Sequence, residues 1–161
     1  MFTAAVVTVS DKGYKGERED ISGAVVTKEL EKGGFAVRSR TVVPDEREMI
    51  ENALKTLADE GVNLVVTTGG TGFAPRDVTP EATLAVAEKV VPGVAEAIRA
   101  QSMKYTDRAM LGRGVCVIRK GTVILNLPGS PKACAESLSA VIGPLGHGVN
   151  ILCGKEGECA R

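Results

Sequence analysis

The sequence lacks an excess of charge of either sign. Its 20 lysines and arginines balance 20 aspartates and glutamates over 161 residues. Without a positive field over the whole molecule, DNA, RNA or an anionic membrane surface would not be attracted, and any anion has to be held by local geometry. A long apolar segment is also missing, because the run from Ala4 to Val9 is too short to cross a bilayer. We therefore expect no nucleic-acid partner and no membrane partner.

Closely spaced zinc ligands are missing as well. The four cysteines form no C-x-x-C pair, and the single histidine, His147, lies between two glycines, so a structural zinc site is disfavoured. Cys116 and Cys134 lie in apolar segments, whereas Cys153 and Cys159 lie in a polar tail. Unpaired cysteines of this kind are typical of a reducing compartment, and we expect a cytoplasmic protein.

Apolar, β-branched runs are present and predict strands that are covered on both faces. They are Ala4 to Val9, Leu64 to Thr67, Val115 to Ile118 and Val123 to Leu127. A further run, Phe35 to Val43, contains alternating arginines and should lie nearer an edge of the sheet. Helical patterns separate these runs. We expect an α/β fold, in which residues 1–150 form one three-layer αβα domain with a mostly parallel central sheet and residues 151–161 form a short tail.

Capping residues indicate where the helices begin and end. Asp45, with a glutamate three residues later, has the spacing of an N-terminal capping pair, and Gly61 should end that helix. Thr79-Pro80 predicts another helix start. Ser130-Pro131 predicts a third, and we expect that last helix to stop near Gly146.

A glycine-rich segment follows the strand that begins at Leu64. We call Gly69-Gly70-Thr71-Gly72 the glycine loop. Backbone without side chains lets amide groups approach an anion closely, so phosphate is the expected guest, although such a turn is also a common tight connection. The loop lacks the Gly-Lys-Ser/Thr ending of a Walker P-loop and the third glycine of a dinucleotide fingerprint. Those two nucleotide-binding classes are therefore excluded.

Charged residues follow within five positions of the end of the glycine loop. Arg76 can hold phosphate oxygens, Asp77 can hold a divalent cation, and the amides of the helix that begins near Pro80 add a positive dipole. Taken singly, each of these residues can also belong to an ordinary turn held by an aspartate and a threonine cap. Their position beside the glycine loop favours phosphoryl chemistry.

Three more loops should reach the same rim, because each follows a predicted strand. They are Ser10 to Gly23, Pro44-Asp45 and Leu127 to Pro131. Asp45 fits a helix cap and a catalytic or metal-binding role equally well, and Ser130 fits both a cap and an anion site. Charged residues and glycines favour a surface loop over Ser10 to Gly23 that can act as a lid.

Together these segments resemble a known family. SDKGYKGEREDISG (Ser10 to Gly23), TTGGTGFAPRDVTPEA (Thr67 to Ala82) and LNLPGSPKA (Leu125 to Ala133) are similar to motifs of the MogA/MoaB family of molybdenum-cofactor biosynthesis proteins, which includes the G domain of gephyrin. The similarity runs in order from about Ala4 to Gly148.

The resemblance implies molybdopterin adenylyltransfer, in which the phosphate of molybdopterin attacks the α-phosphorus of ATP in the presence of Mg²⁺. Asp45 and Asp77 would be the catalytic carboxylates and the ligands of Mg²⁺. Further residues would hold or line the substrates, ATP and molybdopterin: Ser10, Asp11, Gly69, Gly70, Thr71, Gly72, Arg76, Thr79, Glu81, Pro128, Gly129 and Ser130. No side-chain nucleophile is needed, because both reactants bring their reacting groups.

One position departs from the family. Gly112 stands where the family often has serine, so a hydroxyl contact to ligand is absent. The resemblance also implies a homotrimer or a hexamer and contact with other enzymes of the pathway. Two other functions stay open: a binding or scaffold module without catalysis, and a nucleotide pyrophosphatase related to competence-damage-type domains. The presence of both Asp45 and Asp77 argues against the module.

Overall fold

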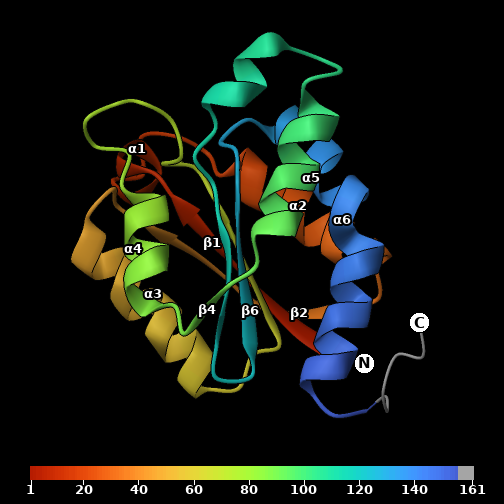
Figure 1. The fold of residues 1–161 in the computed structure, drawn as a ribbon. Coiled ribbons are helices and arrows are strands. Elements are labelled where there is room, and N and C mark those ends of the chain that lie inside the picture. The colour runs from red at the N-terminus through yellow and green to blue at the C-terminus, as the bar shows by residue number, and fades with distance from the viewer. Residues whose placement is uncertain (156–161) are drawn as a thin grey trace.

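A six-stranded sheet forms the middle of the molecule in a computed structural model that describes residues 1–155 (Figure 1). The strands are β1 (Phe2–Val9), β2 (Phe35–Val43), β3 (Leu64–Thr68), β4 (Lys89–Val90), β5 (Cys116–Arg119) and β6 (Thr122–Leu127). Their order across the sheet is β2-β1-β3-β6-β5-β4. The first four in that order are parallel, and β5 runs antiparallel to both of its neighbours. The predicted mostly parallel α/β sheet is confirmed.

Helices cover both faces of this sheet (Figure 1). One layer holds α2 (Ile21–Lys32), α5 (Pro92–Ser102) and α6 (Pro131–Leu152), and the other holds α3 (Arg47–Asp59) and α4 (Thr79–Val86). Two short elements, α1 (Asp11–Tyr14) and η1 (Asp107–Leu111), complete the described part. No helix within residues 1–155 has the length and hydrophobicity needed to cross a membrane.

Alternating residues of the central strands supply two separate cores. Ala4 and Val6 of β1 pack with α2 and α6, whereas Ala5 and Val7 pack with α3 and α4. All four are fully buried. A strand covered on both faces needs apolar side chains at every position, which is why these runs show no polar alternation.

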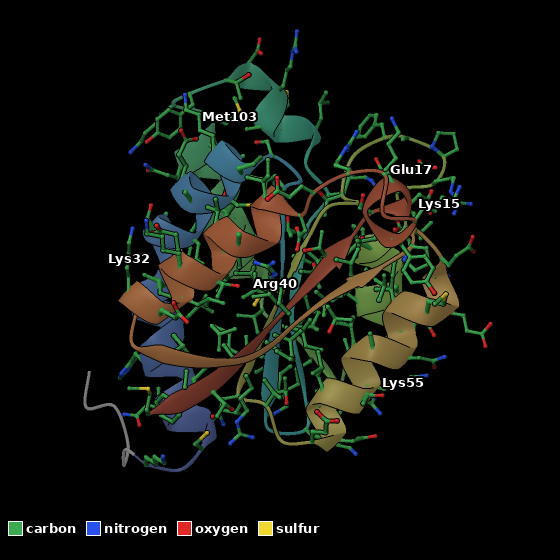
Figure 2. The ribbon with its side chains drawn as sticks, turned by 180° about the vertical axis from the view of Figure 1, so that it is seen from behind. Lys15, Glu17, Lys32, Arg40, Lys55 and Met103 are labelled. Carbon is green, nitrogen blue, oxygen red and sulfur yellow. The ribbon has the colours of Figure 1, made fainter. Side chains whose placement is uncertain are left out.

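The strand with alternating arginines lies at the edge, as predicted. β2 pairs with β1 alone. Figure 2, seen from behind, shows this strand in front of the other strands, with Arg40 labelled. The Arg40 side chain stays 45% exposed and lies 3.6 Å from Asp20 at the start of α2. A central strand would have no room for such a side chain.

Two predicted helix caps are wrong. Helix α3 starts at Arg47 with Glu46 at the N-cap position, and no side chain caps it. Helix α4 likewise has Val78 at its N-cap without a side-chain bond, because the Thr79 hydroxyl donates to the carbonyl of Gly69 at 2.9 Å instead. Of the predicted N-caps only Ser130 is confirmed, with its hydroxyl accepting from the Ala133 amide at 3.2 Å, whereas Gly61 ends α3 as predicted with a positive φ of 74°.

The last helix is longer than predicted. α6 does not stop near Gly146 but continues to Leu152, with Pro144 inside it. Leu145 and Val149 are buried on the same face as the preceding turns and belong to the core. Packing of this face outweighs the low helix propensity of proline and glycine. Cys153 caps the helix and packs against the core, and Cys159 lies outside the described residues.

Candidate active site

Loops after β1, β2, β3 and β6 meet at one edge of the sheet, because all four strands run in the same direction. They surround a cleft of about 610 Å³, which we call the polar cleft. Four carboxylates line it: Glu19, Asp20, Asp45 and Asp77. Arg18 is the only lysine or arginine among the described residues that line it. The cleft therefore carries an excess of negative charge.

Asp45 lies two residues after the end of β2 and is hydrogen-bonded to the loop after β1. Its Oδ2 accepts a hydrogen bond from the Asp11 amide at 2.9 Å, and its own amide donates to Oδ1 of Asp11 at 3.0 Å. Burial raises the pKa of Asp45, and the negative charges of Asp11 and Asp77 raise it further. The ionised form of Asp45 is thus disfavoured, and a nearby cation would stabilise it.

Arg76 binds Asp11, the residue that exchanges two hydrogen bonds with Asp45. Its guanidinium donates to both carboxylate oxygens of Asp11, at 2.6 and 3.0 Å, and to Glu46 at 2.9 Å. The hydrogen bond from Arg76 lowers the pKa of Asp11. Arg76 does not line the polar cleft. In this structure it binds carboxylates of the protein, whereas the sequence suggested phosphate oxygens, and Arg18 is the cation that faces the cleft.

The glycine loop needs its glycines for steric reasons. Gly69 and Gly70 have positive φ angles of 93° and 69°. A Cβ on Gly69 would lie 2.4 Å from the carbonyl oxygen of Val9, and one on Gly70 would lie 2.3 Å from Oγ1 of Thr79. The loop is therefore pressed against the end of β1 on one side and the start of α4 on the other.

Asp77 lies on the polar cleft at the far end of the segment that follows the glycine loop. Its Oδ2 accepts from the Ala74 amide at 3.1 Å, and its own amide donates to the Ala74 carbonyl at 2.9 Å. This small turn fixes the side chain relative to its own loop. The other Asp77 carboxylate oxygen has no hydrogen bond within the described residues and is available to a ligand.

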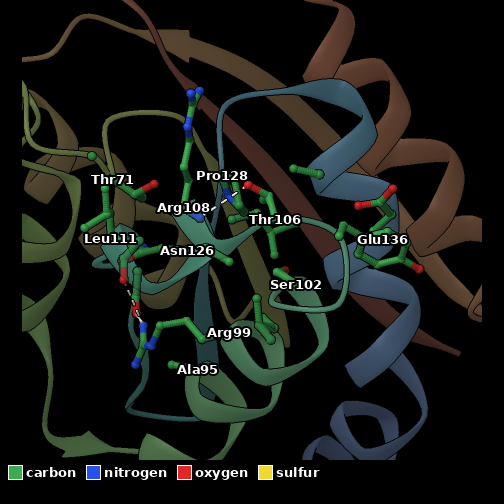
Figure 3. Close-up of a pocket in the computed structure, with 18 residues that line it drawn as sticks. Thr71, Ala95, Arg99, Ser102, Thr106, Arg108, Leu111, Asn126, Pro128 and Glu136 are labelled. Carbon is green, nitrogen blue, oxygen red and sulfur yellow. Dashed lines mark hydrogen bonds between the residues drawn. The ribbon is translucent and has the colours of Figure 1, made fainter.

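A second cavity, of about 310 Å³, lies on the other side of the glycine loop. We call it the apolar cavity, because helix α5, η1 and the start of α6 line it with residues such as Ala95, Ile98, Leu111 and Ala133 (Figure 3). Gly112, at the family's serine position, also lines it. Most of its wall comes from helix faces and a 3₁₀ turn that the sequence patterns did not identify.

The predicted site residues divide between these two spaces. The polar cleft is lined by Ser10, Asp45, Gly69, Gly70, Asp77 and Gly129. The apolar cavity is lined by Thr71, Gly72 and Pro128. The remaining five candidates line neither: Asp11, Arg76, Thr79, Glu81 and Ser130. Three of these five hold other parts of the site, since Arg76 binds Asp11, Asp11 binds Asp45, and Thr79 binds Gly69.

Asp20 is a cleft residue that sequence reasoning missed. It caps α2 by accepting from the Gly23 amide at 2.8 Å and also accepts from the Thr8 hydroxyl at 3.0 Å. An aspartate just before an apolar helix was a visible capping signal. The region expected as a surface loop, Ser10 to Gly23, instead starts with helix α1, which Ser10 caps through the Gly13 amide at 3.0 Å.

Within residues 1–155 no group of three or more histidine, cysteine, aspartate or glutamate side chains is arranged to hold a metal ion. Asp45 and Asp77 offer two hard oxygen donors on one cleft. That number suits Mg²⁺, which is usually held by one or two carboxylates while substrate phosphates and water complete its octahedron.

Comparison with known proteins identifies relatives of the whole fold. Residues 5–147 match the family model described as "Probable molybdopterin binding domain". The chain is 47% identical over 140 residues to a molybdopterin adenylyltransferase of Haemophilus influenzae, covering 84% of this chain and 71% of the relative. It is 41% identical over 153 residues to the Drosophila melanogaster molybdenum cofactor synthesis protein cinnamon, covering 93% of this chain but only 25% of that protein. The crystal structure of the molybdopterin biosynthesis enzyme MoaB from Thermus thermophilus superimposes with a TM-score of 0.91 at 46% identity, covering 98% of this chain and 100% of that one.

Proposed function

The chain belongs to the family of molybdopterin-binding domains, and from that membership and the geometry of the cleft we propose that it is a molybdopterin adenylyltransferase of molybdenum-cofactor biosynthesis. The observation that carries the proposal is the pair of carboxylates, Asp45 and Asp77, on one cleft beside the glycine loop. A relative with that name shares 47% of its residues with the chain over the matched region.

The reaction joins two phosphates. An oxygen of the molybdopterin phosphate forms a bond to the α-phosphorus of ATP, the bond from that phosphorus to the oxygen bridging to the β-phosphate breaks, and pyrophosphate leaves with the electron pair. The protein has little covalent work in such a transfer, so positioning and charge stabilisation supply most of the rate. Backbone amides of the glycine loop are suited to hold the phosphate oxygens, whereas at the start of α4 the Thr79 amide already donates to the Gly70 carbonyl and Pro80 has no N–H.

Charge in the polar cleft supports the need for a divalent cation. Four carboxylates face a single arginine there, so a phosphate chain that entered alone would be repelled. The pKa of Asp45 is raised by burial and by neighbouring carboxylates although the charge of Arg76 opposes this, so the positive charge nearby does not balance the crowded carboxylates. We propose that Asp45 and Asp77 hold Mg²⁺, which would neutralise phosphate charge during the transfer.

Two spaces on either side of one loop suit a reaction with two substrates. The polar cleft offers carboxylates and open backbone, and the apolar cavity offers a wall of aliphatic side chains. We propose that the phosphates meet over the glycine loop, on the polar-cleft side, while a flat heterocycle of one substrate occupies the apolar cavity. Apolar walls with a few polar groups are typical of sites for such rings.

Asp77→Asn and Asp45→Asn test the function. With Mg²⁺, ATP and molybdopterin, each variant should form adenylyl-molybdopterin about 10²- to 10³-fold more slowly, as is typical when one electrostatic group is removed from an active site. Asp59→Asn is the control, because Asp59 pairs with Lys120 and lines neither cavity. Unchanged transfer by both variants would refute the assignment, as would release of free AMP by the natural chain without any adenylyl-molybdopterin.

Oligomeric state and location stay predictions. We propose that the chain forms a homotrimer or a hexamer in the cytoplasm, as the family resemblance implies. Sedimentation of the purified chain at several concentrations tests the first point, and a monomer throughout would contradict it.

A further inference from the structure

Arg113 reaches across from the segment before β5 to the loop that links the glycine loop to α4. Its backbone amide donates to the Thr71 carbonyl at 3.0 Å, and its Nε donates to the Gly72 carbonyl at 2.8 Å. We call residues 73–78 the connecting loop. Both contacts hold the end of the glycine loop, just before the connecting loop begins.

The rest of the same guanidinium holds the second end. Nη2 of Arg113 donates to the Asp77 carbonyl at 2.9 Å, and Nη1 forms an ion pair with Oε1 of Glu81 on α4. Burial opposes ionisation of Glu81, but the hydrogen bond and charge of Arg113 lower the pKa of this carboxyl overall. All three guanidinium nitrogens therefore have acceptors. Only the planar fork of arginine can satisfy three acceptors placed in this way.

Apart from Arg113, the main restraint on this stretch is the side chain of Arg76, which binds Asp11 and Glu46. Residues 73–76 between the two held ends are exposed, and Phe73 is 72% exposed. Thr79 binds back to Gly69 and Gly70, but these bonds secure the glycines and the helix start rather than Gly72 or Asp77. The Ala74–Asp77 turn is internal to the loop. Within residues 1–155, Arg113 is thus the one side chain that bonds to the backbone of Asp77, whereas Arg76 holds the same loop only through its own side chain.

Arg113 is itself well anchored. Nη1 of Arg99, on α5, donates to the carbonyls of Gly112 at 3.3 Å and Gly114 at 2.9 Å, the residues on either side of Arg113 (Figure 3). Arg99, Gly112 and Gly114 all line the apolar cavity. A chain of contacts therefore runs from the wall of that cavity through Arg113 to Asp77 on the polar cleft.

We propose that Arg113, held by Glu81, is the positioning residue that fixes Asp77 in the geometry required for adenylyl transfer. This inference rests on the proposed function for its catalytic consequence. It reassigns Glu81, which was expected to line the substrate pocket, to the partner that orients Arg113. Arg113 lines neither cavity and touches no substrate space.

The absence of tryptophan from the chain allows a direct test. Phe73→Trp places a single fluorophore on the exposed connecting loop and serves as the reference protein. Adding Arg113→Met should lower the fluorescence anisotropy of that tryptophan, since the loop loses the side-chain bonds to its two ends at Gly72 and Asp77. The same variant should lower kcat by about 10- to 100-fold, the usual cost of a misplaced catalytic group, with KM for ATP changed less than about threefold.

Arg119→Met in the same reference protein is the matched control. Arg119 lies on neighbouring β5 and donates to the Val86 carbonyl at 3.1 Å, without contact to the connecting loop. It should leave anisotropy and kcat unchanged. Equal losses in both arginine variants would show a general structural effect and overturn the proposal.

Arg113→Lys keeps the test decisive if Arg113→Met does not fold. Lysine retains the positive charge beside Glu81 but has one nitrogen for acceptors that lie in three directions. We expect a folded protein with lowered anisotropy and lowered kcat. Natural anisotropy together with natural kcat in this variant would overturn the proposal. If the natural chain catalyses no transfer, the anisotropy still reports whether Arg113 orders the loop, so failure of the function and failure of the inference are distinguishable.

Discussion

The polar cleft and the apolar cavity share the glycine loop but differ in how the fold builds them. The cleft is made by the ends of four parallel strands, whose positions are fixed by the ladder of the sheet. The cavity is made by α5, η1 and the first turn of α6, which are held together by side-chain packing, by the backbone bond from Thr106 to Ser102 and by the bonds of Arg99. The proposed transfer site thus lies at the sheet edge, and the proposed ring site lies between helices.

The strongest way to break this division is to deform the loop that both spaces share. Gly69→Ala forces an alanine to φ 93° and places its Cβ 2.4 Å from the Val9 carbonyl oxygen. We expect a loss of about 2–4 kcal/mol in the free energy of unfolding, because backbone strain and overpacking add. Urea denaturation measures it. Transfer activity should fall even where the variant is fully folded, since the cleft and the cavity are both distorted.

Gly148→Ala is the matched control for that substitution. Gly148 lies in α6, its added Cβ would meet no atom within 4 Å, and its φ is not positive. Helix propensity predicts a gain of about 0.5–1 kcal/mol. A Gly69→Ala protein as stable as the natural chain would show that the loop can relax and that its contact with β1 is not essential.

A smaller effect should separate the two spaces instead of damaging both. Ala109→Leu adds three carbons on η1 at the wall of the apolar cavity. If a ring binds there, KM for the substrate that carries it should rise about tenfold, which corresponds to about 1.4 kcal/mol. The KM of the other substrate and kcat should change little, because Asp45 and Asp77 are untouched. Steady-state kinetics with each substrate varied in turn measures the split.

Ala100→Leu tests whether that result comes from the cavity. Ala100 is exposed on α5 and does not line the cavity. Its kinetics should match those of the natural chain. If Ala109→Leu leaves both KM values unchanged, the apolar cavity holds no substrate ring and the comparison between the two spaces loses its functional meaning.

The sequence predicted the sheet edge well, for physical reasons. Continuous β-branched runs identify strands buried on both faces, and the direction of parallel strands then brings the loops after them together. Asp45 and Asp77 come from loops more than thirty positions apart in the chain, yet both line the polar cleft as the strand pattern required. The glycine loop was recognisable for a different reason: its backbone has positive φ angles, which favour glycine, so the requirement is visible in the composition.

Contacts between side chains and distant backbone could not be predicted from local patterns. The Asp45 cap was wrong, because the carboxylate found the Asp11 amide after β1 rather than an amide of its own helix. Thr79 likewise bonds to Gly69 instead of capping α4. Arg113 follows Gly112 at a position where the family often also has arginine, but its acceptors at Gly72 and Asp77 are carbonyls whose positions only the folded loop defines.

The smallest predicted effect concerns the stability cost of the polar cleft. Burial, with the charges of Asp11 and Asp77, raises the pKa of Asp45 above its ordinary value of 3.8. The folded state therefore disfavours the ionised form, and the natural chain loses stability as pH rises from 3.8 through the folded pKa. Asp45→Asn removes that charge while its amide oxygen can still accept from Asp11. At pH 7 the variant should therefore have a higher Tm than the natural chain. We expect a rise of only about 2 °C, because solvent in the open cleft screens the charges.

Two comparisons make this gain specific. Well below pH 3.8 Asp45 is protonated in both states, so the advantage of Asp45→Asn in thermal melts should disappear there. Asp59→Asn should have the opposite sign, since the hydrogen bond from Lys120 lowers the pKa of Asp59 and its loss at pH 7 removes a favourable pair. We expect Asp45→Asn to be inactive but more stable than the natural chain, and Asp59→Asn to be active and no more stable. That result would show that the charge of Asp45 serves catalysis and lowers the stability of the fold. Equal melting temperatures for Asp45→Asn and the natural chain at every pH would show that this charge does not lower the stability.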